Sequence, residues 1–196
     1  KVENISGKFI DSRKNSFPGE VVSDFLQENE NYFPKLEEFA SNFYNKIQIK
    51  NRVGYSSICE YLRSKHGIEV KDVVPNEEKP FTKQFDPIKK IFLVSDYLTL
   101  ETKKLYAGAQ VAQLESVKVI DEYLNSFSFP SEESKKLSKV ALLNYAGAAI
   151  IMPYKPFYEE CTKQRYDVEL LQNTFAVSFE QVAHRITCLQ NPKMKG

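Results

Sequence analysis

Histidine and cysteine, which most often act as metal ligands, bases or nucleophiles, are few and scattered in this chain. The histidines, His66 and His184, fall in separate predicted helices, and the cysteines are Cys59, Cys161 and Cys188. No two cysteines form a C-x-x-C pair, the spacing that most often indicates a zinc site. The sequence therefore favours two ordinary histidines and three free thiols over a catalytic or metal centre.

Short motifs for phosphate binding or acyl transfer are also absent: there is no G-x-x-x-x-G-K-[ST] loop, G-x-G-x-x-G fingerprint or G-x-S-x-G elbow. A net charge of +1 argues against a nucleic-acid surface spread over the whole chain. No apolar run is long enough for a membrane helix, and the first residues lack the apolar core of a signal peptide. We expect a cytoplasmic protein with reduced cysteines and no membrane contact.

Apolar residues recur at helical spacing along most of the chain. They predict helices over residues 18–28, 34–47, 57–66, 99–124, 132–151, 156–162, 167–175 and 179–190. Between the third and fourth helices, apolar residues in short runs predict strands near 68–74, 81–85 and 91–94, with a turn at Asp86-Pro87. We expect an α+β fold that is mostly helical, with a small antiparallel β-meander over residues 67–95.

Two of the predicted helices carry unusually small side chains. Ala107-Gly108-Ala109 narrows the face of one, and the other runs from Ala141 to Ile151 with Asn144 and Tyr145 among small residues. Two such faces fill the space between them less completely than leucine-rich faces would. We therefore expect a gap between these helices that could admit an apolar ligand.

The last two predicted helices, 167–175 and 179–190, have the spacing of a helix-turn-helix. The second of them offers only His184 and Arg185 as cationic donors, which is too few to read a DNA groove. We therefore expect a helix hairpin with buried apolar residues. Those residues are Phe175, Phe179 and Val182.

Five blocks of sequence occur together: Asp24–Leu36, Tyr61–Val70, Asn144–Phe157, Arg165–Leu171 and Phe175–Arg185. The last of them reads FAVSFEQVAHR and is the most distinctive. In these blocks, over roughly residues 18–191, the chain resembles the short-chain fatty acyl transcriptional regulator family.

The resemblance implies a bacterial regulator in three parts: an N-terminal helix-turn-helix, a middle sensor, and a cysteine-containing C-terminal segment that holds an iron–sulfur cluster in some members. We expect residues 1–17 to be a linker from a helix-turn-helix outside this chain, and residues 18–196 to be an acyl-CoA sensor domain. The cysteines present are not those of the cluster segment, so no cluster is expected. We expect a homodimer that meets DNA only through the N-terminal domain and controls carbon or fatty-acid metabolism genes.

The sensor of this family is similar in layout to the ImmA/IrrE metallopeptidase-like fold, in which one helix carries H-E-x-x-H. There, two histidines hold zinc and the glutamate acts as a base. The matching positions here are Ala109, Gln110 and Gln113. Alanine has no donor atom and amides are poor zinc ligands. The resemblance therefore implies a degenerate ImmA/IrrE-like core with no metal and no enzymatic activity.

The resemblance implies coenzyme A or an acyl-CoA as the ligand, bound between helices 99–124 and 132–151 and the meander. Small and apolar residues would line the acyl slot: Ala107, Ala112, Leu143, Tyr145 and Ala146. Basic side chains would hold the phosphates: Arg52, Lys139 and Arg165. The expected ligand-binding set is Arg52, Tyr61, Lys139, Leu143, Asn144, Tyr145, Tyr154 and Arg165.

Two other functions stay open from the sequence. The first is a dimerisation or scaffold domain that binds no ligand, which a thermal-shift screen against acyl-CoAs would distinguish. The second is a remnant metallopeptidase, whose ligands would have to be Glu115, Glu169 and His184. Metal analysis of the purified protein separates that function from a metal-free sensor.

Overall fold

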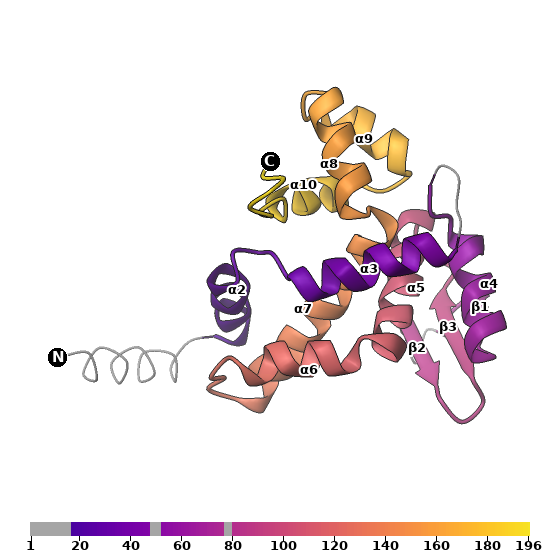
Figure 1. Cartoon of the computed structure of the whole chain (residues 1–196). Coiled ribbons are helices and arrows are strands. Elements are labelled where there is room, and N and C mark those ends of the chain that lie inside the picture. The colour runs from indigo at the N-terminus through magenta and orange to yellow at the C-terminus, as the bar shows by residue number, and fades with distance from the viewer. Residues whose placement is uncertain (1–16, 48–51, 77–79) are drawn as a thin grey trace.

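The computed structural model describes residues 17–47, 52–76 and 80–196; residues 1–16, which make up nearly all of the expected linker, lie outside that part. The described part is mostly helical with one small sheet, as the sequence predicts (Figure 1). In chain order the elements are α2 (Pro18–Glu28), α3 (Pro34–Lys46), α4 (Tyr55–His66), β1 (Glu69–Val73), β2 (Lys83–Asp86), β3 (Ile91–Ser95), α5 (Leu100–Glu115), α6 (Val117–Asn125), α7 (Glu132–Ile151), α8 (Tyr154–Lys163), α9 (Val168–Phe175) and α10 (Phe179–Thr187).

The sheet is mixed, and the expected antiparallel meander is wrong in strand order. Strand β3 lies in the middle, antiparallel to β2 and parallel to β1, with Glu69 opposite Ile91 and Val73 opposite Ser95. The β2–β3 hairpin turns after Asp86 as predicted. A meander requires β2 to pair with β1, but β2 pairs with the other edge of β3.

Helix α7 is the central element, because α2, α3, α5, α6 and α10 all contact it. Against α5 the two backbones touch: a Cβ atom built on Gly147 would lie 2.8 Å from the Ala109 nitrogen and 2.8 Å from the Leu105 oxygen. The small residues therefore bring the helices into direct contact, and the expected gap between these two faces is closed at Gly108 and Gly147. A side chain at either glycine would separate the helices.

Two hydrophobic clusters form the core on either side of this contact. One joins the sheet residues Phe92 and Val94 to Ala107 of α5 and to the C-terminal helices. The other joins α2, α3, α6 and α7 to the end of α5 and includes Ala112 and Ala146, which are fully buried. These alanines, expected in the acyl slot, are thus core residues. Among the described residues, no helix is long and apolar enough to cross a membrane.

Helix ends follow the capping residues of the sequence, with one exception. The Ser131 and Ser178 side chains cap α7 and α10, and Gln181 completes the capping box of α10. The exception is the predicted helix 99–124, which is two helices. It breaks at Ser116, whose hydroxyl donates a hydrogen bond to the Ala112 carbonyl at 2.7 Å.

Helices α9 and α10 form a hairpin, as the sequence predicts, and it is anchored to α5. The ammonium group of Lys104 donates to the carbonyl oxygens of Phe175 and Ala176, at 2.7 and 3.0 Å, where α9 ends. Burial lowers the pKa of Lys104 to about 8. Phe175 and Val182 are buried, but the expected burial of Phe179 is wrong: its side chain is 55% exposed, because the first residue of α10 points outward.

The close contact of α5 and α7 predicts that Gly147→Ala lowers the free energy of unfolding by about 1–3 kcal/mol, the usual cost of overpacking. The gain in helix propensity, at most about 1 kcal/mol, does not offset a clash with backbone atoms. Gly19→Ala in α2 is the matched control, because nothing lies within 4 Å of its Cβ position. Urea unfolding measures both, and equal stabilities of the two variants would contradict the close contact.

Candidate ligand-binding cleft

A cleft of about 480 Å³ lies where α5, α7 and α10 meet. Its volume is in the range of small-ligand sites. The end of α2 and the residue Asn31 close one side. The lining residues are Leu26, Asn31, Thr102, Leu105, Tyr106, Ala141, Asn144, Tyr145, Ala148, Ser178, Glu180, Gln181, His184, Arg185, Thr187 and Cys188.

The α7 wall of the cleft combines apolar surface with one unpaired hydrogen-bond acceptor. Ala141, Asn144, Tyr145 and Ala148 recur at three- and four-residue spacing, which places them on one face of the helix. The side-chain oxygen of Asn144 is buried and accepts no hydrogen bond from any described residue. Because a buried acceptor without a donor costs free energy, a ligand that brings an N–H or O–H group can satisfy it.

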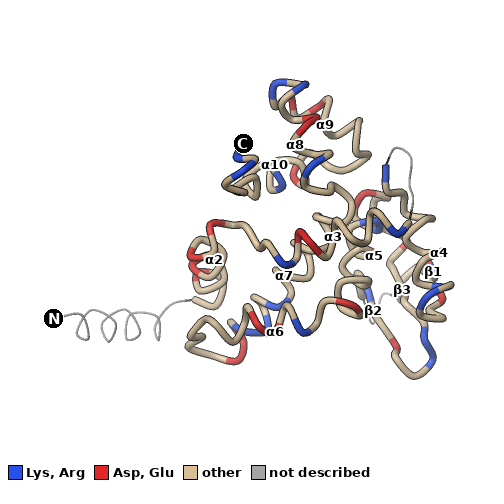
Figure 2. The backbone as a smooth tube through the Cα atoms, viewed as in Figure 1, with Lys and Arg blue, Asp and Glu red and all other residues tan. Residues whose placement is uncertain are grey.

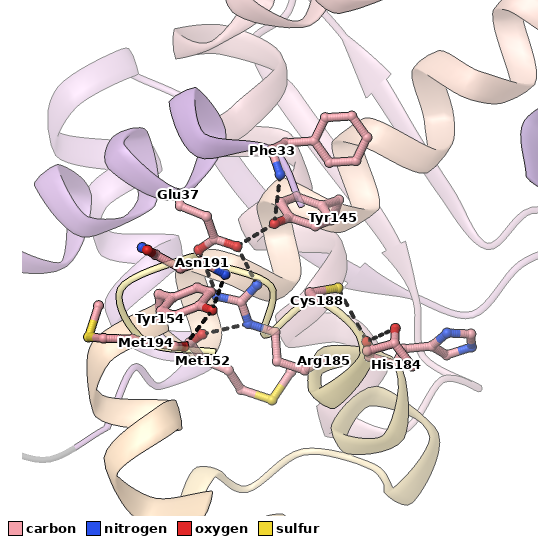
Figure 3. Close-up of polar contacts among 11 residues, drawn as sticks. Phe33, Glu37, Tyr145, Met152, Tyr154, His184, Arg185, Cys188, Asn191 and Met194 are labelled. Atoms are coloured by element: carbon pink, nitrogen blue, oxygen red, sulfur yellow. Dashed lines mark hydrogen bonds and ion pairs between the residues drawn. The ribbon is translucent and has the colours of Figure 1, made fainter. Parts of the chain in front are cut away.

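A buried ion pair, which includes the lining residue Arg185, lies next to the cleft (Figure 3). The two terminal nitrogens of Arg185 donate to the two carboxylate oxygens of Glu37, at 2.6 and 2.7 Å, and its Nε donates to the Met152 carbonyl at 3.0 Å. Arg185 is 1% exposed. Burial by itself lowers the pKa of Arg185, but the Glu37 carboxylate outweighs burial and holds that pKa above its ordinary value.

Two tyrosines lie beside this ion pair. The Tyr145 hydroxyl donates to the Glu37 carboxylate and accepts from the Phe33 backbone N–H at 3.2 Å. Burial, with a contribution from Glu37, raises the pKa of Tyr145 well above its ordinary value. The Tyr154 hydroxyl accepts from the Asn191 N–H and donates to a carbonyl of the C-terminal segment, and burial raises its pKa to about 12. Both hydroxyls therefore stay protonated at neutral pH and can donate these hydrogen bonds.

The structure brings together some of the expected ligand-binding residues and separates others. Asn144 and Tyr145 line the cleft, and Tyr154 lies beside the Arg185 guanidinium, 5.7 Å from it to the ring centre. Leu143 instead packs against the core cluster of α2, α3 and α6. Tyr61 lies elsewhere: its hydroxyl donates to Glu115, a residue that lines a separate hollow of about 430 Å³.

The three cations expected to hold phosphates do not line the cleft. Lys139, on α7, is paired at 3.1 Å with Asp121 of α6. Arg165 lies between α8 and α9 in a left-handed backbone conformation, and Arg52 precedes α4. Lysine and arginine alternate with acidic residues over much of the described chain (Figure 2). Sequence context alone did not identify cations at this site.

Most of the α10 wall was missed by the sequence prediction. Helix α10 was interpreted as part of a hairpin, with His184 as a ligand only in the metallopeptidase alternative, yet Ser178, Gln181, His184 and Arg185 of this segment line the cleft. One indication was present: Arg185 lies three residues after the apolar Val182, on the face that the hairpin buries. A cation on a buried helix face requires a buried partner of opposite charge, here Glu37.

The zinc site of the related peptidase fold does not fit the residues present. At the matching positions, Gln113 is exposed, and Ala109 is buried where the backbones of α5 and α7 touch and has no donor atom for a metal. Gln110 is buried, and its side-chain nitrogen has no partner among the described residues. Within the described ranges, Glu115, Glu169 and His184 are not part of any group of three metal-binding side chains either.

Comparisons with known proteins agree with this fold. A family model described as the IrrE N-terminal-like domain (Peptidase_M78) matches residues 63–187. The HTH-type transcriptional regulator RamB of Mycobacterium tuberculosis (strain ATCC 25618 / H37Rv) is 28% identical over 92% of this chain and 38% of RamB. The propionyl-CoA carboxylase regulator of Cereibacter sphaeroides is 26% identical over 91% of this chain and 37% of that protein. The chain thus spans less than two thirds of these relatives.

A solved structure shows the same fold. It is described as a Mycobacterium tuberculosis transcriptional regulator and superposes with a TM-score of 0.86 at 26% sequence identity. The match covers 92% of this chain and 55% of that chain. The similarity therefore extends beyond the region matched by the family model and includes the helices that precede it.

The buried ion pair predicts a large loss of stability when one partner is removed. Arg185→Met is expected to lower the free energy of unfolding by about 3–5 kcal/mol, because it leaves the Glu37 carboxylate buried without its cation. Lys155→Met is the matched control: its exposed pair with Glu159 is 3.8 Å long, and the expected loss is below about 1 kcal/mol. Urea unfolding measures both. A loss for Arg185→Met no larger than that of the control would contradict a buried pair.

Proposed function

The chain belongs to the IrrE N-terminal-like domain family, and from this premise we propose that it is the ligand-sensing part of a transcriptional regulator whose ligand is a short-chain acyl-CoA. Its relatives RamB and PrpR are named as HTH-type transcriptional regulators. A third relative is named as a propionyl-CoA carboxylase regulator, and that name connects a short acyl-CoA with regulation.

The unpaired oxygen of Asn144 is the observation that carries the proposal. The pantetheine arm of coenzyme A contains secondary amides, whose N–H groups can donate to that oxygen and remove the cost of leaving it unpaired. A short acyl chain needs apolar walls, and Leu105, Tyr106 and Ala148 supply them around the same cleft. A thioester arm with amide N–H groups suits Asn144 and these apolar walls better than a polyanion does, because no lysine lines the cleft and its arginine is paired.

The phosphates of the ligand lie outside the cleft in this proposal. No lysine lines the cleft, and its arginine, Arg185, is already paired with Glu37. Of the expected phosphate contacts, Lys139 is the one on the cleft helix α7, where it would have to exchange Asp121 for a phosphate. Arg52 and Arg165 are not part of the proposed site.

Binding, and not catalysis, is the role proposed for the cleft. Cys188 is the thiol that lines it, and burial raises the pKa of this thiol, so the reactive thiolate is disfavoured. The zinc-binding positions of the related peptidases are occupied by residues that cannot replace the metal's ligands. We therefore assign no reaction to this chain.

Contact with DNA is proposed to occur through a helix-turn-helix outside the 196 residues, connected by residues 1–17. The chain covers 38% of RamB, so a relative of that length has room for such a domain. A homodimer would present two of these domains to a symmetric operator. Ligand binding would then shift the balance between two arrangements of the DNA-binding domains.

The proposal predicts that propionyl-CoA binds and raises the melting temperature of the protein, since a ligand that binds only the folded state stabilises it. Asn144→Leu is expected to weaken binding about two- to tenfold, the equivalent of one hydrogen bond. The same change leaves the stability of the free protein equal or higher, because it removes a buried unpaired acceptor. Calorimetry and thermal unfolding measure the two effects.

Asn173→Leu is the control, because Asn173 is exposed on α9 and does not line the cleft. Its affinity for propionyl-CoA should equal that of the wild type. Absence of heat and of a thermal shift with every acyl-CoA from acetyl to hexanoyl would remove the proposed function. Equal affinities of the Asn144 and Asn173 variants would show that the ligand binds elsewhere.

A further inference from the structure

We propose that the cleft selects acyl groups by charge: it binds acyl groups that end in a methyl group and rejects acyl groups that end in a second carboxylate. This inference rests on the proposed function, because it specifies which acyl-CoAs the cleft accepts. The inference is drawn from the ionisable side chains that line the cleft, among them Arg185 and Glu180.

Arg185 is the arginine that lines the cleft, and its charge is already paired. Both carboxylate oxygens of Glu37 receive hydrogen bonds from its terminal nitrogens, and the Met152 carbonyl receives the one from Nε. The pair is thus neutral as seen from the cleft. An incoming carboxylate would have to compete with Glu37, which is 6% exposed and also accepts from the Tyr145 hydroxyl.

The other acidic or basic side chains of the cleft favour a neutral occupant. Lysine and aspartate do not occur among the lining residues, and Glu180 is the glutamate there. No ion pair joins Glu180 to any described residue; it lies in the first turn of α10, where only the helix N-terminus offsets its charge. No lysine lines the cleft and Arg185 is paired with Glu37, so neither of the permanently cationic side-chain types is free there.

A second carboxylate on the acyl group would therefore lose its water without gaining a cation. Transfer of an ionised carboxylate into such a site is strongly unfavourable, and Glu180 adds repulsion between like charges. A terminal methyl group at the same place loses no hydrogen bonds and gains contact with apolar walls. The cleft thus distinguishes the two kinds of acyl group because it has no free cation to pair with a second carboxylate. The size of the acyl group is not needed for this distinction.

Butyryl-CoA and succinyl-CoA test this directly, because both acyl groups have four carbons and the rest of the ligand is identical. Calorimetry on the 196-residue chain at pH 7.5 is expected to show that butyryl-CoA binds at least about a hundredfold more tightly. Equal affinities would overturn the charge selection and leave the proposed function intact. Absence of binding by both ligands would overturn the proposed function, and this inference with it.

A variant that supplies the missing cation provides the second test. Glu180→Lys changes an exposed residue at the second position of α10, so the fold is retained, and it is expected to reduce the preference for butyryl-CoA about tenfold. Glu133→Lys is the matched control, since Glu133 is exposed at the second position of α7 and does not line the cleft. An unchanged preference in Glu180→Lys would overturn the role of charge in the cleft.

Discussion

The buried contact between Arg185 and Glu37 is the interaction on which the arrangement of the molecule depends. It joins α3, near the start of the described chain, to α10, near its end, across 148 residues of sequence. The Met152 carbonyl, where α7 ends, is the third member. A bidentate pair of this kind has a narrow geometry, so it fixes the position of α10 over α7 as well as the distance between them.

The same pair determines the chemistry of the cleft. A cation that the core requires for its own neutrality is not available to a ligand, although its side chain forms part of the wall. The polar groups that remain for a ligand include Asn144 on α7, Asn31, Thr102 on α5 and the polar side chains of α10. The cleft is therefore a weakly polar site with a charged pair beneath it.

Local sequence patterns predicted most helices and strands, but they could not predict which strands or side chains far apart in the sequence pair with each other. Capping by Ser131 and Ser178 is encoded within four residues, so those helix starts were predicted correctly. The pairing of β1 with β3 joins residues as far apart in sequence as Glu69 and Ile91, and no periodicity reports which strands become neighbours. Asn144 and Tyr145 were identified because they interrupt a run of small residues, whereas the basic side chains were selected without knowledge of their partners, and Lys139 proved to be paired with Asp121.

The touching backbones at Gly108 and Gly147 have a mechanical consequence. Two helices in such contact cannot slide or roll on one another without first separating. Helices α5 and α7 therefore behave as a single rigid unit. Any motion that changes the volume of the cleft then has to move α10, or the end of α2 with Asn31, against this pair of helices. Arg185 attaches α10 to Glu37 of α3. A displacement of α10 would therefore also move α3 relative to the rigid pair formed by α5 and α7.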